Sequence, residues 1–133
     1  MLLTKIHHIA IICSNYEVSK KFYTEILGLK VIREVYREAR DSYKLDLSIG
    51  DSQIELFSFQ TSPDRPSYPE ALGLRHLAFE VDNIDEVVSE LKFHNIDVEP
   101  IRIDELTGKR FTFFSDPDKL PIELYENKLS EYS

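Results

Sequence analysis

Two histidines and two glutamates recur at one spacing in this chain of 133 residues, with the interval from His8 to Glu55 equal to the interval from His76 to Glu123. Imidazole nitrogen and carboxylate oxygen are good ligands for Zn, Ni, Mn, Fe or Co and poor ones for thiophilic metals. A single His or Glu on a strand is more often a hydrogen-bonded structural residue. Four of them at matching positions of a repeat predict a site for one divalent cation, with positions left open for water or substrate oxygens.

The residues around the first pair predict a strand, a helix and three further strands. Ser14 and Glu17 have the form of a capping box at the start of the helix, and Gly28 is suited to its end. Gly50-Asp51-Ser52 is a hairpin signal. The four strands are expected at Ile6–Ile12, Leu29–Tyr36, Tyr43–Ile49 and Gln53–Phe59.

The second pair lies in a segment that repeats this order. Asp82 or Asn83 can cap its helix, which is expected to end near Asn95. Between the two repeats, residues 60–72 hold three prolines and are expected to form a linker. The four strands of the second repeat are expected at Arg75–Val81, Val98–Ile103, Arg110–Phe114 and Pro121–Tyr125.

The alternation of residues along these strands places the ligand candidates on one face. Ile122 and Leu124 point to one side of their strand, so Glu123 points to the other. The same alternation separates the aliphatic neighbours of His8, Glu55 and His76 from the ligands. We therefore expect the aliphatic face to cover the helix and the His and Glu residues to project from the opposite, concave face.

These residues resemble the vicinal oxygen chelate superfamily and, within it, glyoxalase I. The resemblance runs from about Lys5 to Glu126 and is carried by HHIAI, KKFYTEILGLKV, IELF, LRHLAFEVDNID and RFTFFSDPDKLPIELYE. It implies an α+β fold in one domain spanning residues 1–133. Two tandem βαβββ modules, at 5–59 and 73–126, would form a curled eight-stranded mixed sheet around a metal site.

The resemblance also implies roles for the four residues. His8, Glu55, His76 and Glu123 fall on the metal-ligand positions of glyoxalase I, with Glu123 as the catalytic base and Glu55 as its counterpart. The metal would be Zn or Ni first, with Mn, Fe or Co as alternatives. The reaction would be enediolate chemistry on a small oxygenated substrate of the hemithioacetal type. One departure is Lys119, where the family's DPDGLP turn has Gly.

Other residues are candidates for binding the substrate. Arg37, Arg40, Arg75, Lys109 and Arg110 could form a basic rim for an anionic substrate, although ion pairs with the many acids are the ordinary alternative. Four aromatic residues could line the pocket or pack in the core instead: Phe57, Phe111, Phe113 and Tyr125. We expect His7 to be structural, Glu80 to be a pocket-rim or solvated residue and Cys13 to be buried.

The composition limits the kinds of molecule that the protein is expected to bind. A formal net charge of −8 disfavours nucleic acid and anionic membranes, because both need clustered cations. No apolar run is long enough to span a membrane. Cys13 is the only cysteine, which favours a reducing cytoplasm. A small-molecule substrate is therefore expected, and the family implies a homodimer.

Two other functions remain open for this scaffold. The same ligands would also serve metal-dependent epimerisation, hydrolysis or detoxification of an antibiotic. A non-enzymatic binding protein is the third possibility, although a binding cup has no need for both glutamates.

Overall fold

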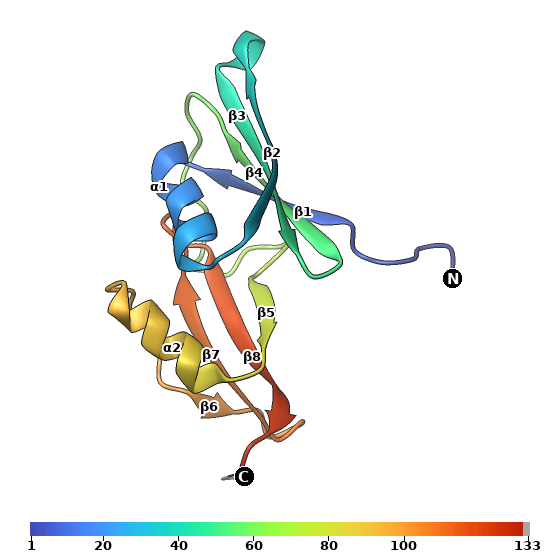
Figure 1. The fold of residues 1–133 in the computed structure, drawn as a ribbon, viewed down its shortest axis with the longest axis vertical. Coiled ribbons are helices and arrows are strands. Elements are labelled where there is room, and N and C mark those ends of the chain that lie inside the picture. The colour runs from blue at the N-terminus through green and yellow to red at the C-terminus, as the bar shows by residue number, and fades with distance from the viewer. Residues whose placement is uncertain (132–133) are drawn as a thin grey trace. The chain divides into compact units, whose positions relative to one another are not determined.

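The structure is a computed structural model that describes residues 1–131 (Figure 1). It comprises two compact units, which meet in sequence between Asp64 and Arg65, inside the expected linker. None of the helices in the described residues is long and apolar enough to cross a membrane.

The first unit contains the predicted strand, helix and three strands in that order. The helix continues from an α-helical into a π-helical turn, where the Leu27 amide donates to the carbonyl of Phe22. Its elements are β1 (His8–Cys13), α1 (Tyr16–Lys21), a π-helical turn (Phe22–Ile26), β2 (Lys30–Arg37), a 3₁₀ turn (Glu38–Arg40), β3 (Ser42–Ile49) and β4 (Ser52–Ser58).

The second unit has the same order and the same sheet topology. The two four-stranded sheets run β1-β4-β3-β2 and β5-β8-β7-β6, with β1 parallel to β4 and β5 parallel to β8. The predicted repeat of βαβββ modules is confirmed, with its eight strands in two mixed sheets. The elements of this unit are β5 (Leu77–Val81), α2 (Ile84–Phe93), β6 (Arg102–Ile103), β7 (Lys109–Ser115) and β8 (Pro121–Leu129).

Burial follows the predicted alternation along the central strands. Ile54 and Leu56 of β4 are buried, as are Ile122 and Leu124 of β8, whereas Glu55 and Glu123 are only partly covered. Burying one such aliphatic side chain stabilises a fold by about 1.5–3 kcal/mol. The aliphatic face therefore packs in the core of each unit and leaves the glutamates on the other face.

Two local predictions were wrong. The cap of α1 is Asn15 rather than Ser14, because Asn15 has the extended backbone of a cap and its Oδ1 accepts from the Val18 amide at 3.2 Å. The strand predicted at Val98–Ile103 shrinks to the two residues of β6. Pro100 lies in that segment and has no amide hydrogen to donate to a ladder.

Candidate metal-binding site

The first unit brings His8 and Glu55 together on adjacent strands. His8 Nε2 lies 3.5 Å from Glu55 Oε2. The other ring nitrogen of His8, Nδ1, lies 3.0 Å from Nδ1 of His7, so one imidazole donates to the other. Nε2 is therefore the nitrogen of His8 that faces the carboxylate, and His7 helps to orient the ring.

The second unit builds the same pair from His76, just before β5, and Glu123 on β8. His76 Nε2 lies 3.3 Å from Glu123 Oε1. The ring of His76 meets Phe113 edge to face, with centroids 5.0 Å apart. Its Nδ1 is buried without a hydrogen-bond partner among the described residues. Both units thus present Nε2 toward a carboxylate.

The distances within each pair fit two ligands of one cation. Two donors about 2.1 Å from a metal at tetrahedral angles are separated by about 3.4 Å. Within residues 1–131, no group of three or more His, Cys, Asp or Glu side chains gathers into a metal site. Each unit by itself therefore offers two donors of the right chemistry. A set of four donors requires the pair from each unit.

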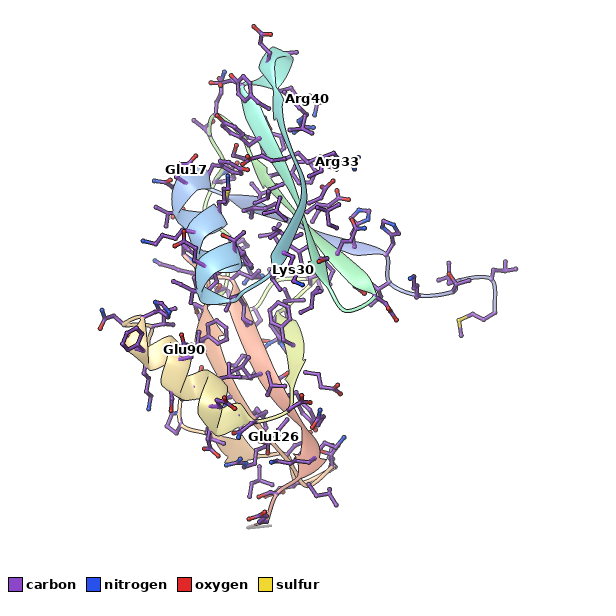
Figure 2. The ribbon with its side chains drawn as sticks, in the orientation of Figure 1. Glu17, Lys30, Arg33, Arg40, Glu90 and Glu126 are labelled. Carbon is purple, nitrogen blue, oxygen red and sulfur yellow. The ribbon has the colours of Figure 1, made fainter. Side chains whose placement is uncertain are left out.

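The surroundings of Glu55 are charged. Lys44 Nζ lies 3.7 Å from Glu55 Oε1 and 2.9 Å from Asp46 Oδ1, and Arg33 Nη2 lies 3.0 Å from Asp46 Oδ2. Figure 2 shows Arg33 on β2. Burial raises the pKa of Asp46, but hydrogen bonds from Lys44 and Arg33 outweigh it and hold that pKa below its usual range. A chain of alternating charges therefore leads to the first carboxylate.

The surroundings of Glu123 are aromatic. In the sheet register Asp46 pairs with Glu55, whereas Phe113 pairs with Glu123. By the same register, Phe111 occupies in the second unit the position that Lys44 occupies in the first. The repeat therefore places the same pair of His and Glu against two different sets of neighbours, one ionic and one aromatic.

The residues of the first unit that were predicted to bind the substrate lie in two different places. Arg37 and Phe57 share the face of Glu55, with the Arg37 guanidinium carbon 5.1 Å from the centroid of the Phe57 ring. Arg37 also donates from Nη2 to Ser42 Oγ at 2.8 Å. Arg40 lies in the exposed turn between β2 and β3, as Figure 2 shows.

In the second unit, Arg110 lies on the face away from Glu123. Its Nε lies 3.0 Å from Glu126 Oε1, and its Nη2 lies 2.9 Å from Asp85 Oδ2. Glu126 is buried among the core residues and also accepts from the Ile84 amide at 2.9 Å. Arg110 therefore forms ion pairs, as expected from the alternative to a basic rim for the substrate. Arg75 is likewise paired with Glu70 at 2.8 Å.

Tyr125 and Phe113 lie on the same face as Glu123. Tyr125 Oη donates to Asp104 Oδ2 at 2.7 Å and also contacts the hydroxyl of Thr107. The bond from Tyr125 is the main reason that the pKa of Asp104 lies below its usual range. The Tyr125 ring stacks with Phe111. Both polar and aromatic contacts therefore hold the aromatic residues beside Glu123 in place.

Sequence reasoning missed Lys44 and Asp46. Their alternation with the buried Leu45 and Leu47 along β3 indicated that they share one face. It did not indicate which residues of β4 they meet, because strand register is a long-range property.

The chain matches the Glyoxalase/Bleomycin resistance protein/Dioxygenase superfamily over residues 5–124. It is 65% identical over 127 residues to the Bacillus subtilis protein "Uncharacterized protein YwkD", covering 95% of this chain and 99% of that one. Among solved structures, a glyoxalase family protein from Enterococcus faecalis superposes with a TM-score of 0.88 at 52% identity, covering 95% of this chain and all of the other (100%).

More distant relatives include characterised enzymes. Glyoxalase I from Leishmania major is 27% identical with a TM-score of 0.72, over 93% of this chain and 87% of that one. Human mitochondrial methylmalonyl-CoA epimerase is 30% identical over 95 residues, which cover 68% of this chain and 53% of the epimerase. The fold, the repeat and these similarities agree, and the chain belongs to the Glyoxalase/Bleomycin resistance protein/Dioxygenase superfamily.

Proposed function

We propose that this protein is a metal-dependent lyase or isomerase that removes a proton next to a carbonyl group of a small oxygenated substrate. The observation that carries the proposal is the duplicated pair of His Nε2 and Glu carboxylate at 3.5 and 3.3 Å. The four ligands are His8, Glu55, His76 and Glu123, and the cation is Zn or Ni. When bound, the cation supplies a Lewis acid for the substrate oxygens.

The different neighbours of the two glutamates support different roles for them. Lys44 lies beside Glu55 and offsets its negative charge. Within the described residues, Glu123 has no salt bridge to Lys or Arg, and its cross-strand neighbour is Phe113. A carboxylate whose oxygens are not engaged by an ammonium group is free to approach a proton of the substrate. Glu123 is therefore the proposed base, and Glu55 its counterpart at the cation.

Replacing Glu123 by Gln tests this proposal. The variant keeps the size of the side chain and removes its basicity, so turnover of candidate hemithioacetals should fall by about 10²- to 10⁴-fold. Turnover and exchange of the substrate C–H proton with deuterium from solvent are measured on metal-loaded protein.

Glu80→Gln is the matched control, because Glu80 of β5 lies on the same face of the sheet as Glu123 but is exposed. Its activity should equal that of the parent protein. A protein that binds no divalent cation, and whose activity is the same in the Glu123 variant, would contradict the proposal.

A second candidate function is epimerisation, which the similarity to methylmalonyl-CoA epimerase favours. Epimerisation needs the same proton removal but returns the proton to the opposite side of the carbon. Incubating a single enantiomer of a 2-substituted acyl thioester with the protein distinguishes the two functions. An epimerase converts the single enantiomer into a mixture of both configurations, whereas a glyoxalase-type enzyme converts the hemithioacetal and leaves the thioester unchanged.

A further inference from the structure

The second unit contains a cavity of about 910 Å³ between the segment 65–75 and the strands β6 and β7. Cavities of about 300–1,000 Å³ are typical of sites for small molecules. All of its lining residues lie in the second unit. The four ligand candidates are not among them, so the proposed metal ligands do not themselves line the cavity.

Cations outnumber acids in the lining of this cavity. Four of its side chains are positively charged and two are negatively charged. The two acids are already paired: Glu70 lies 2.8 Å from Arg75, and Glu99 lies 3.1 Å from Arg102. The excess positive charge therefore belongs to the remaining two cations, Arg65 and Lys119.

Neither Arg65 nor Lys119 takes part in a salt bridge within residues 1–131. Arg65 donates instead to neutral acceptors, Ser67 Oγ at 3.1 Å and the carbonyl of Leu74 at 3.3 Å. Those bonds orient the guanidinium and leave its charge uncompensated. In a chain with a formal net charge of −8, two cations without acidic partners on one cavity indicate an anionic ligand.

The backbone of Lys119 gives a second, independent observation. Its φ is +68°, in the left-handed region that strains an L side chain and suits glycine. The turn itself is built by Asp116, whose Oδ1 accepts from the amides of Asp118 and Leu120. A glycine would serve that turn better. Residues held in a strained conformation cluster at functional sites, and here the strained residue is a lysine that lines the cavity.

Aromatic rings form part of the apolar lining of the same cavity. Phe111 and Phe113 line it, and the guanidinium carbon of Arg102 lies 4.9 Å from the centroid of the Phe111 ring. Phe113 also contacts the ring of His76. The aromatic wall of the cavity therefore continues to the second His and Glu pair.

We propose that this cavity binds an anionic group, a carboxylate or a phosphate, that is attached to a flat apolar group. Lys119 and Arg65 recognise the charge, and Phe111 and Phe113 contact the apolar group. The identification of this ligand as the substrate rests on the proposed function, but the binding itself needs no metal. The cavity thus defines a substrate class: small molecules with one charged end and one planar end.

Titration of the full-length protein with phenyl phosphate, followed by calorimetry, tests the proposal. Three variants separate the charge of Lys119 from its backbone strain. Lys119→Met removes the charge and keeps the strain, Lys119→Gly removes both, and Lys119→Arg keeps both. Binding should weaken about fivefold in the Met and Gly variants and stay unchanged in the Arg variant. Thermal unfolding should show a higher Tm for the Gly variant only.

Lys128→Met is the matched control, since Lys128 is exposed on β8 and does not line the cavity. Inorganic phosphate and phenol, each carrying half of the ligand, should bind more weakly than phenyl phosphate. The proposal is overturned if phenyl phosphate does not bind, if the Met and Gly variants bind it as tightly as the parent, if the Lys128 variant loses as much, or if either half-ligand binds equally well. Glu123→Gln should lose turnover and keep this binding, so failure of the cavity and failure of the proposed catalysis give different results.

Discussion

Glu55 and Glu123 carry the same carboxylate at equivalent positions of two modules, yet their neighbours differ. Lys44 lies 3.7 Å from Glu55, and Asp46 and Arg33 continue the chain of charges behind it. Beside Glu123 stand Phe113 and the ring of His76. A duplicated fold can therefore give two glutamates at equivalent positions chemically different surroundings.

Replacing Lys44 by Met should tighten the binding of a divalent cation about fivefold. The ammonium group repels the cation and competes with it for Glu55, and a unit charge a few ångströms away in water contributes about 1 kcal/mol. Competition with a chromogenic chelator measures the affinity.

Lys44→Arg keeps the charge and is the control, for which the affinity should not change. Weaker metal binding in the Met variant would contradict the proposal that Glu55 is a ligand whose charge Lys44 offsets.

At the scale of elements, one buried carboxylate joins a strand to a helix in the second unit. Glu126 of β8 accepts from the first amide of α2, at Ile84, and from the guanidinium of Arg110 on β7 (Figure 2). It therefore serves the helix N-terminus, where orphan amides need acceptors, and neutralises a largely covered cation. Asn83 caps the same helix end from its own side chain.

Replacing Glu126 by Gln should lower the free energy of unfolding by about 2–4 kcal/mol, because it leaves the Arg110 charge without its main partner. Urea denaturation measures the change. Glu90→Gln on the exposed face of α2 is the control and should change the stability by less than about 0.5 kcal/mol.

The free energy of unfolding that the Glu126→Gln variant loses should depend on pH. Burial raises the pKa of Glu126, but hydrogen bonds from Arg110 and the Ile84 amide outweigh it, so the folded pKa lies below the unfolded value of about 4.3. The stabilisation is therefore fully present above about pH 5 and is lost as pH falls through the folded pKa. An equal difference between parent and variant at pH 7 and pH 3 would contradict this account.

At the scale of the molecule, the proposed site depends on the repetition of the module. Each unit offers one imidazole and one carboxylate, and neither holds a third donor among residues 1–131. Two donors bind a divalent cation weakly, whereas four satisfy the usual coordination of Zn. The proposed activity is thus a property of the pair of modules.

Removing either pair should abolish stoichiometric metal binding. Two double variants test this: His8→Ala with Glu55→Ala, and His76→Ala with Glu123→Ala. Metal content after dialysis is the measurement, and retention of half of the metal by either variant would show that each pair binds separately.

The chain supplies a matched control for these variants. His94 Nε2 lies 3.4 Å from Glu90 Oε1 on α2, a pair of the same types at the same distance outside the proposed site. Replacing both by Ala should leave the metal content unchanged. Mixing the two ligand variants then tests whether the ligands come from one copy or from two, as they could in the homodimer that the family suggests.

Residue patterns along the chain were enough to predict the repeat, the order of elements in each module and the faces of the central strands. Each of these depends on local periodicity: alternation in strands such as Gln53–Phe59 and a stripe of apolar residues in the helix at Ile84–Leu91. The fold and its family were therefore predictable. The four His and Glu residues were singled out by their repeated spacing, and the parallel pairing of β1 with β4 and of β5 with β8 brings each His near its Glu.

The partners that surround those residues come from contacts between distant segments. The register of β3 against β4 places Lys44 beside Glu55, and the pairing of β7 with β8 gives Arg110 to Glu126. The folding of the segment 65–75 against β6 and β7 creates the cavity at Lys119. Local sequence does not encode these contacts, because register and docking follow from packing between segments far apart in the chain.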